Sequence, residues 1–512
     1  MSFRRPGPLR LSLALMLLAL GAAAPAARSW RPRSAADGRP NLVFILTDDQ
    51  DLNLDSLRYM PLTRQLIAGR GMTFDQDFVP LSLCCPSRST ILTGLYPHNH
   101  KIYRNRAPEG GFEKFAALGH EETTVATALH AAGYRTALLG KYLNHYPRPG
   151  DPTHVPPGWD EWASPAAGDA YGEFRYTLNE NGTLVRHGAE PADYLTDVLA
   201  AKAVDFIRRS SAAGQPFFLY VAPYAPHKPA TPAPRHAALF PGLRAPRTPA
   251  FNEADVRTKP AEVRKLPRLS EPQVRQIDSL YRRRVQSLQA VDEAVAAIVQ
   301  ALEAAGRLGD TYVFFTSDNG FHMGQHRLKP GKYTPYETDV HVPLLVRGPG
   351  IAAGSRTGAI TSSVDFAPTL AALAGASLLR EPDGRSLAPI LHGRAPARWR
   401  QVALLEQYEF TPEENPPGNV LEPPDPQDDG TLAYPSHLGV RTADFKYVEY
   451  GTGEREVYDP RHDPDELDNL EIRAPRAWLE RMSDLARALG SCAGETCREI
   501  EERALPAPEI RK

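Results

Sequence analysis

The sequence predicts an α/β fold, with a large, mostly parallel β-sheet sandwiched by helices and a smaller C-terminal antiparallel sheet with one helix. Apolar runs rich in β-branched residues alternate with amphipathic segments through most of the 512 residues, as in parallel sheets whose strands are joined by helices. After about residue 395 the pattern changes to short strands in close succession. A formal net charge of -2 argues against nucleic acid as a partner.

The first expected strand is the continuous apolar run NLVFIL at residues 41–46, which stops at Thr47, Asp48 and Asp49. A run without polar alternation is typical of a strand that is buried on both faces. A similar run at residues 311–319 stops at Asp318 and Asn319. Because ligands collect at the carboxyl ends of parallel strands, we expect these acids to lie at a functional edge of the sheet.

The remaining elements follow in order between and after these two strands. Expected helices cover residues 125–132, 194–209, 284–305 and 364–374, and expected strands cover residues 135–141, 216–221 and 342–346. The C-terminal part is expected to hold short strands at 402–406, 439–441, 446–450 and 456–458, followed by a helix at 477–489. We therefore expect one large domain over residues 39–395 and a small α+β domain over residues 396–512.

The N-terminus has the three-part layout of a secretory signal peptide, which we place at residues 1–27. Arg4, Arg5 and Arg10 form a basic start, residues 11–20 are apolar, and residues 22–27 are small. The apolar run is short for a membrane span, and no other segment resembles one. The protein is therefore expected to be exported, to a periplasmic, secreted or lysosomal location.

Export would place the four cysteines in an oxidising compartment. Cys492 and Cys497 are close enough in sequence to close a small loop, and we expect a disulfide between them. Cys84 and Cys85 would then be left without other partners. A bond between adjacent residues is strained, because disulfide geometry needs a larger Cα separation than neighbours provide. The adjacent pair therefore needs another explanation.

The residues at the two strand ends offer a possible metal site. Asp48, Asp49, Asp318 and Asn319 supply only oxygen ligands, without interleaved cysteine or histidine. A hard cation such as Ca²⁺ or Mg²⁺ suits this set better than zinc does. The alternative is that these residues cap helices or form turns, which is a common use of Asp and Asn.

Residues 83–100 read LCCPSRSTILTGLYPHNH, and this run closely resembles the signature of the sulfatase family. The resemblance implies that Cys84 is oxidised by a formylglycine-generating enzyme to formylglycine, which also belongs to the metal site, while Cys85 occupies a variable position. It also implies hydrolysis of sulfate esters by the hydrated aldehyde. The alternative for such a motif alone is a buried cysteine in front of a helix.

Other motifs extend the resemblance. The family's catalytic cations and proton donor match Arg88, Lys141 in GKY, His227 in APH, and Lys332 shortly after SDNG. His98, Asn144 and His326 are further candidates, for substrate binding. Taken singly, each of these residues could be an ordinary solvated or surface side chain. Many sulfatases carry a histidine two or three residues after the lysine that matches Lys141, but this chain has Leu143 and Asn144 there, so the base of the elimination step stays open.

Within the family, GKYLN, TDDQD and SDNGFHMGQ resemble the branch of the N-acetylglucosamine-6-sulfatases and heparan endosulfatases. The branch implies a 6-O-sulfate on N-acetylglucosamine or a related sugar, and activity on aryl sulfates is also expected. Substrate recognition is expected in two loops, residues 223–267 and 411–429, because loops carry most binding residues. The long basic insert of the endosulfatases is absent, which favours action on small or terminal sugars.

Three other functions stay open at this point. The chain could be a generic arylsulfatase with another natural substrate, or a phosphate or phosphonate ester hydrolase of the same broader superfamily. Those hydrolases usually carry more metal ligands, or a threonine or serine nucleophile. The third alternative is a non-catalytic protein that binds sulfated glycans, with Cys84 unmodified.

Overall fold

The computed structural model describes residues 1–2, 38–394, 396–408, 434–503 and 506–509. The expected signal peptide lies outside these residues, apart from Met1 and Ser2, and so does the expected recognition loop at residues 411–429. Among the described residues, no helix combines the length and apolar character needed to cross a membrane.

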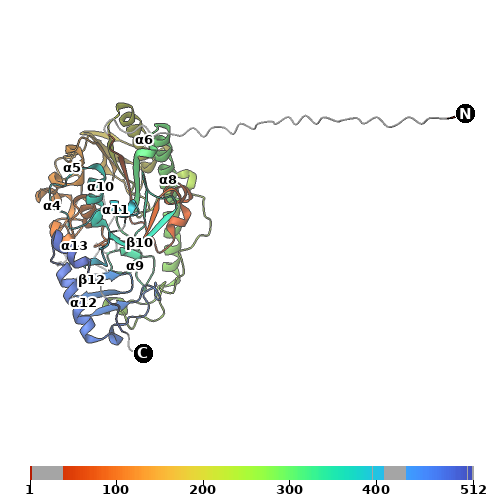
Figure 1. Cartoon of the computed structure of the whole chain (residues 1–512). Coiled ribbons are helices and arrows are strands. Elements are labelled where there is room, and N and C mark those ends of the chain that lie inside the picture. The colour runs from red at the N-terminus through yellow and green to blue at the C-terminus, as the bar shows by residue number, and fades with distance from the viewer. Residues whose placement is uncertain (3–37, 395, 409–433, 504–505, 510–512) are drawn as a thin grey trace.

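A ten-stranded sheet forms the centre of the described chain (Figure 1). In order across the sheet, the strands are β10 (Ser355–Ser362), β2 (Met72–Phe78), β9 (Leu344–Arg347), β8 (Thr311–Ser317), β1 (Asn41–Thr47), β7 (Phe217–Ala222), β3 (Arg135–Gly140), β4 (Glu161–Gly168), β5 (Tyr176–Glu180) and β6 (Thr183–Arg186). The five neighbours β8, β1, β7, β3 and β4 are all parallel. Antiparallel pairing involves β9, β5 and β6. The expected parallel sheet is therefore confirmed at its centre.

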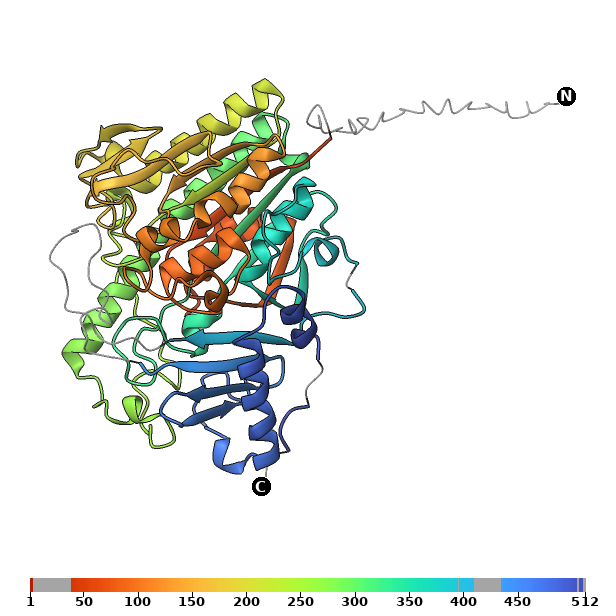
Figure 2. The ribbon, with the colours of Figure 1, turned by 90° about the vertical axis from the view of Figure 1, so that its left-hand side faces the viewer.

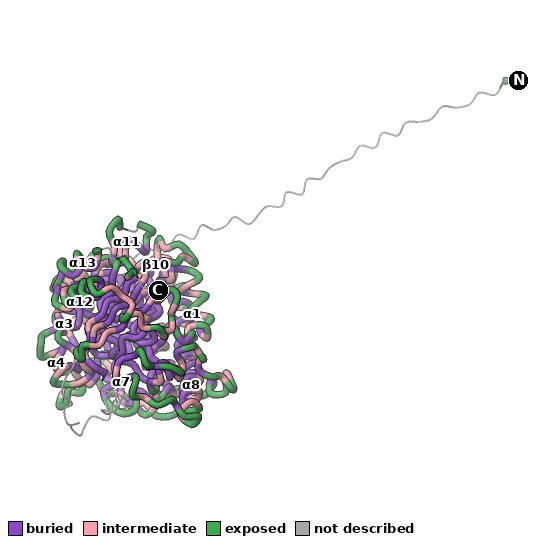
Figure 3. Tube along the Cα trace, turned by 90° about the horizontal axis from the view of Figure 1, so that it is seen from below, coloured by how far each residue is buried: buried purple, intermediate pink, exposed green. Residues whose placement is uncertain are grey.

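Alternate residues of the central strands pack into two cores, one on each face of the sheet. Leu42, Phe44 and Leu46 of β1 point to one core and Val43 and Ile45 to the other, as the two-residue period of a strand requires. The first face is covered by α2 (Cys84–Thr93), α4 (Gly111–Ala117), α5 (Val125–Ala131), α10 (Phe366–Ala374) and α11 (Ala388–Leu391). The second face is covered by α1 (Pro61–Leu66), α6 (Leu195–Ala213) and α8 (Glu271–Ala304). Figure 3 shows the resulting buried centre with exposed segments around it.

Shorter elements complete the described chain. The other helices are α3 (Pro97–His100), α7 (Ala261–Arg264), α9 (Glu337–Val340), α12 (Arg476–Leu489) and α13 (Glu495–Glu501). Single 3-10 turns lie at Ser56–Tyr59, Ala68–Arg70, His120–Thr123, Pro191–Asp193, Pro234–His236, Leu308–Asp310, Ser363–Asp365 and Glu471–Arg473.

Helix α8 is longer than expected, because it begins at Glu271 and not at residue 284. Ser270 and Gln273 form a capping box at its start, and Pro272 lies in the first turn, where its missing N–H costs nothing. The prolines before residue 284 favoured a loop in the sequence, whereas the capping residues show where the helix begins. The buried residues Ile277, Leu280 and Tyr281 fix this extra part of the helix to the protein.

A second sheet lies in the C-terminal part (blue in Figure 2). It is antiparallel in the order β11 (Val402–Gln407), β12 (His437–Thr442), β13 (Lys446–Tyr450) and β14 (Arg455–Tyr458), and α12 packs on it. This confirms the expected C-terminal sheet and helix. The domain boundary at residue 395 stays a prediction, since the core under this sheet also contains Tyr96 and Val364.

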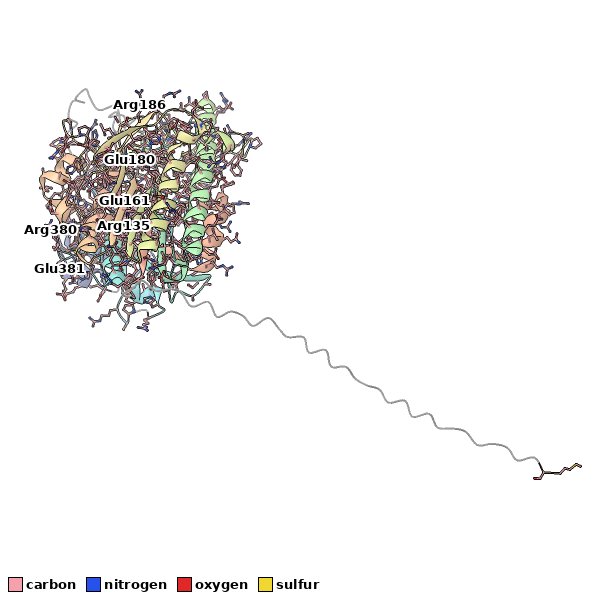
Figure 4. The ribbon with its side chains drawn as sticks, turned by 90° about the horizontal axis from the view of Figure 1, so that it is seen from above. Arg135, Glu161, Glu180, Arg186, Arg380 and Glu381 are labelled. Carbon is pink, nitrogen blue, oxygen red and sulfur yellow. A yellow bond between two sulfur atoms is a disulfide. The ribbon has the colours of Figure 1, made fainter. Side chains whose placement is uncertain are left out.

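The amino ends of the parallel strands carry paired surface charges. Arg135 at the start of β3 hydrogen-bonds to Glu161 at the start of β4 (Figure 4). Arg209 of α6 donates two hydrogen bonds to the same carboxylate, at 2.6 and 2.7 Å. The charges at this end are thus paired with one another, whereas the candidate site residues lie at the opposite end of the same strands.

Candidate active site

The carboxyl ends of four adjacent parallel strands bring the candidate residues together. Asp48 and Asp49 follow β1, Asp318 and Asn319 follow β8, and Lys141 follows β3. His227 lies in the loop after β7, and α2 begins beside these loops with Cys84 as its first residue. The side chains of all these residues are at most 3% exposed. The expected gathering of the strand-end residues is therefore present in the fold.

Cys84 lies against both aspartates of the first loop. Its Sγ is 3.3 Å from Asp48 Oδ1 and 3.8 Å from Asp49 Oδ1. Lys332 Nζ donates a hydrogen bond to Asp49 Oδ1 at 2.6 Å and is 2.7 Å from Cys84 Sγ. Cys492 and Cys497 form the expected disulfide, and within the described residues neither Cys84 nor Cys85 takes part in a disulfide.

Arg88 lies one helical turn after Cys84 and links two of the loops. Its Nε donates to Asp318 Oδ2 at 2.8 Å, and its Nη1 donates to the carbonyl oxygen of Lys141 at 2.9 Å. Its Nη2 is 3.8 Å from Asp48 Oδ1 and makes no hydrogen bond with any residue that the structure describes. Lys141 Nζ donates to the other oxygen of Asp48 at 2.7 Å. The Nη2 group of the buried Arg88 guanidinium can therefore donate a hydrogen bond to an anion.

Carboxylates and cations balance in number in this cluster. They are Asp48, Asp49 and Asp318 against Arg88, Lys141 and Lys332. Burial favours the neutral form of each group, but Lys141, His227 and Arg88 hold the pKa of Asp48 well below its usual value. Burial also opposes the charge on Lys141, whose pKa is nevertheless raised, chiefly by the Asp48 carboxylate. Burial and the Asp48 carboxylate raise the pKa of the Cys84 thiol, so it is protonated.

Side-chain atoms that can bind a metal gather at the centre of the cluster. Ligand atoms of Asp48, Asp49, Cys84 and His227 all lie within 4.8 Å of one another. Asp49 Oδ2 and Asn319 Oδ1 are buried and have no hydrogen-bond partner within the described parts of the chain, although Asn319 Nδ2 donates to Asp49 Oδ1 at 2.7 Å. Buried oxygens without donors are costly unless another group compensates them. A hard divalent cation would compensate both atoms.

His227 faces the same carboxylates from the opposite loop. Its Nδ1 donates to the carbonyl oxygen of Lys228 at 2.7 Å, and its Nε2 is 3.5 Å from Asp49 Oδ2. Burial lowers the pKa of His227, although Asp49 and Asp48 oppose this shift. The ring of Tyr171 packs against the His227 ring at a centroid separation of 4.6 Å. No sequence motif pointed to Tyr171, because only the fold brings its loop to this place.

A second residue that the sequence did not reveal is Arg284 of α8. Its guanidinium donates to the carbonyl oxygen of Asp49 and, at 3.1 Å, to that of Pro226, which precedes His227. It also lies 4.5 Å from the centre of the Phe321 ring. Arg284 therefore ties the loop after β1 to the loop after β7, and it would hold Asp49 and His227 at a fixed separation.

The loop of Lys332 is fixed by a buried histidine–aspartate pair. His322 Nδ1 is 2.9 Å from Asp339 Oδ2, and the backbone of His322 exchanges hydrogen bonds with Gly331. The same carboxylate accepts a hydrogen bond from the backbone N–H of Thr334 at 3.1 Å. Lys332 is thus held between two anchored residues, which reduces the entropy lost when its amine is positioned.

Three expected substrate-binding residues have contacts of other kinds. His98 lies between Glu406 and the disulfide loop, with Nδ1 2.8 Å from Glu406 Oε2 and Nε2 2.8 Å from the carbonyl oxygen of Cys492. His326 donates from Nδ1 to Glu253 at 2.7 Å and packs on Tyr336. Asn144 is buried in the loop after β3, where its carbonyl oxygen accepts from the Phe112 N–H. Their roles in substrate binding stay predictions.

Known proteins match this chain over most of its length. A family model described as sulfatase matches residues 40–376. The N-acetylglucosamine-6-sulfatase of Homo sapiens is 36% identical over 488 residues, which cover 91% of this chain and 87% of the relative. A putative extracellular sulfatase Sulf-1 homolog of Caenorhabditis elegans is 39% identical over 382 residues, which cover 72% of this chain and 53% of the relative.

A solved structure has a fold similar to that of this chain. It is described as a complex with its substrate D-glucosamine-2-N,6-O-disulfate, and it superimposes with a TM-score of 0.70 at 25% sequence identity. The superposition covers 88% of this chain and 97% of that chain. The likeness therefore extends over both the large sheet and much of the C-terminal part.

Proposed function

This chain belongs to the sulfatase family and is a sulfuric ester hydrolase, and we propose that it removes the 6-O-sulfate of N-acetylglucosamine or a related sugar. Cys84, converted to formylglycine, would be the nucleophile, and Ca²⁺, or alternatively Mg²⁺, would be the cation. The observation that carries this proposal is the placement of Cys84 Sγ 3.3 Å from Asp48 and 2.7 Å from Lys332 in a buried charged cluster.

The cation would be held by Asp48, Asp49, Asp318 and Asn319, together with the side chain at position 84. The clustering of ligand atoms of Asp48, Asp49 and Cys84 supports this, and so do the Asp49 Oδ2 and Asn319 Oδ1 atoms, which are buried without a donor among the described residues. When bound, such a cation supplies Lewis acidity that favours ionisation of a neighbouring hydroxyl group. The group that takes the proton in the elimination step stays open, because Leu143 and Asn144 stand where many sulfatases carry a histidine.

The modified side chain supplies two hydroxyl oxygens when hydrated, one to attack sulfur and one whose deprotonation expels sulfate. Arg88, Lys141 and Lys332 would neutralise the sulfate oxygens as the bond between sulfur and the sugar oxygen breaks. His227 in its doubly protonated form, with Nδ1–H on the Lys228 carbonyl oxygen and the positive charge favoured by Asp49 and Asp48, would give its Nε2 proton to that sugar oxygen, so that the sugar leaves as an alcohol. The N-terminus of α2 adds favourable partial positive charge at the same place.

The charge balance of the cluster supports an anionic ester as substrate. Because its carboxylates and cations are equal in number, a bound divalent metal would make the site positive. A sulfate monoester carries one negative charge near neutral pH and would be attracted. The Arg88 Nη2 group, which makes no hydrogen bond in the described structure, supports the same choice.

Maturation of Cys84 would precede folding. The side chain is 0% exposed and lies under the loops of Asp48 and Lys332. A formylglycine-generating enzyme could therefore reach Cys84 only in the unfolded chain. This order agrees with export of the nascent chain by the signal peptide at residues 1–27, which we propose leads to a periplasmic, secreted or lysosomal location.

The sugar is proposed from the named substrates of similar proteins. The human relative is an N-acetylglucosamine-6-sulfatase, and the solved structure holds a 6-O-sulfated glucosamine. The expected recognition loop at residues 223–267 connects β7 to α8 and carries His227, so it begins at the reacting centre. We propose that terminal or small sugars are the substrates.

The matured protein is expected to release sulfate from 6-O-sulfated N-acetylglucosamine with kcat/KM at least about tenfold above that for the 3-O-sulfated or 4-O-sulfated isomer. The physical reason is that only one regiochemistry brings the ester oxygen beside His227 when the ring is bound in the loop. Sulfate release from each pure isomer checks this. A preference for another position, or hydrolysis of aryl sulfates alone, would contradict the proposed substrate.

A further inference from the structure

The loop between β4 and β5 supplies an aromatic side chain to the catalytic cluster. Tyr171 is 5% exposed, and its ring contacts the ring of His227 with an interplanar angle of 55°. The Tyr171 ring also contacts the ring of Tyr224, at a centroid separation of 4.8 Å. Lys141 Nζ is 5.1 Å from the centre of the Tyr171 ring. One side chain thus contacts both the proposed proton donor and a proposed sulfate-binding cation.

The backbone around Tyr171 is firmly anchored. Glu173 accepts hydrogen bonds from the N–H and the hydroxyl of Thr196, both at 2.9 Å, and its carbonyl oxygen accepts from Leu195. The N–H of Gly172 donates to Asp169 at 2.8 Å, and a β-carbon at Gly172 would lie 2.1 Å from an oxygen of that carboxylate. These bonds join the loop to the start of α6, so the Tyr171 ring is held in place before substrate binds.

The ring of His227 makes one short hydrogen bond, through Nδ1, so contact with a neighbouring ring adds a second constraint on its orientation. The bond from Nδ1 to Lys228 fixes one ring atom, whereas Nε2 has a distance of 3.5 Å to Asp49. Contact with an aromatic ring limits rotation of the imidazole about its side-chain bond. The two constraints together direct Nε2 toward the cluster of Cys84 and Asp49.

We propose that Tyr171 is a positioning residue that orients His227 for proton transfer to the leaving oxygen. This inference rests on the proposed function of His227. Proton transfer matters most when the leaving group is a strong base, such as a sugar alkoxide, and little when it is nitrophenolate. The contribution of Tyr171 therefore depends on the leaving group, which a purely structural contribution would not do.

Replacement of Tyr171 by leucine is expected to lower kcat for the 6-O-sulfated sugar by about a hundredfold, with a loss below about threefold for nitrophenyl sulfate. KM for the sugar changes little, because the side chain does not contact the sugar in this account. Y171F keeps the ring and is expected to recover most of the kcat for the sugar that Y171L loses. H227Q is expected to show the same leaving-group pattern, and combination with Y171L adds little further loss, since the two residues act as one unit.

Y176L is a matched control. Tyr176 is a buried tyrosine at the start of β5 whose ring stacks on His187 at 4.8 Å, away from the cluster. Its replacement lowers the melting temperature without changing the ratio of the two activities. An equal loss on both substrates in Y171L, or additive losses with H227Q, would overturn the role of Tyr171. Absence of sulfate release from both substrates in the wild type would instead overturn the proposed function, and this inference with it.

Discussion

Replacement of Cys84 by serine is expected to turn the enzyme into a protein that reacts once and then stops. The serine hydroxyl occupies the position of Cys84 Sγ, between Asp48, Asp49 and Lys332. It can attack sulfur, and the sugar leaves as an alcohol while the sulfo group stays on the serine oxygen. The serine β-carbon carries no second hydroxyl group, so sulfate cannot be expelled by elimination. Steady-state turnover is expected to fall by at least about a thousandfold.

Two measurements check this expectation. Intact mass after incubation with nitrophenyl sulfate should show the addition of one SO₃ group to C84S and none to C84A. C85S is the matched control, because Cys85 is equally buried in the next position of α2 but points into the hydrophobic core. It is expected to keep wild-type turnover. Repeated turnover by C84S at a rate near that of the wild type would contradict the role of a two-hydroxyl nucleophile.

Removal of divalent cations is expected to lower the activity more than about a hundredfold, and Ca²⁺ or Mg²⁺ should restore it. The reason is that Asp49 Oδ2 and Asn319 Oδ1 lie buried without donors, beside Asp48. Lys141 and Lys332 contact Asp48 and Asp49 at 2.7 and 2.6 Å. A cation bound to these aspartates would compete with the lysines for the carboxylates and make the lysines more available to the sulfate oxygens.

Thermal unfolding gives a second readout that needs no catalysis. A cation that binds only the folded chain stabilises it by about 2.7 kcal/mol at a concentration one hundred times its Kd. The melting temperature of unmodified protein should therefore rise with Ca²⁺, and D49N should abolish the rise. D51N is the matched control, since Asp51 lies in the same loop but bonds to Ser56 and Arg284. Full activity after chelation, or no effect of Ca²⁺ on unfolding, would contradict the metal site.

The central strands could be predicted because burial on both faces gives each of them a continuous apolar run in the sequence. Strands β1 and β8 are buried on both faces over their whole length, so every residue is under the same selection for apolar character. Strands β2 and β10 could not be predicted in this way. They lie at one side of the sheet, where alternate residues are partly exposed, and their sequences MTFDQDF and SRTGAITS are largely polar.

The residues of the candidate site also differ in whether the sequence could predict them. Asp48, Asp49 and Asp318 could be predicted because parallel strands end at a common edge. The sulfatase resemblance gave Cys84 and the basic residues, whose positions along the chain have no pattern of their own. Tyr171 and Arg284 could not be found, since their contacts depend on how a connecting loop and a long helix pack on the sheet.

The most direct test of this account is mass spectrometry of the peptide that contains Cys84, from protein made in its native host. We expect an aldehyde at position 84, which a carbonyl reagent would trap, and an unmodified thiol at Cys85. An unmodified thiol at Cys84 in a preparation that hydrolyses sulfate esters would contradict it. The nucleophile would then have to be another group.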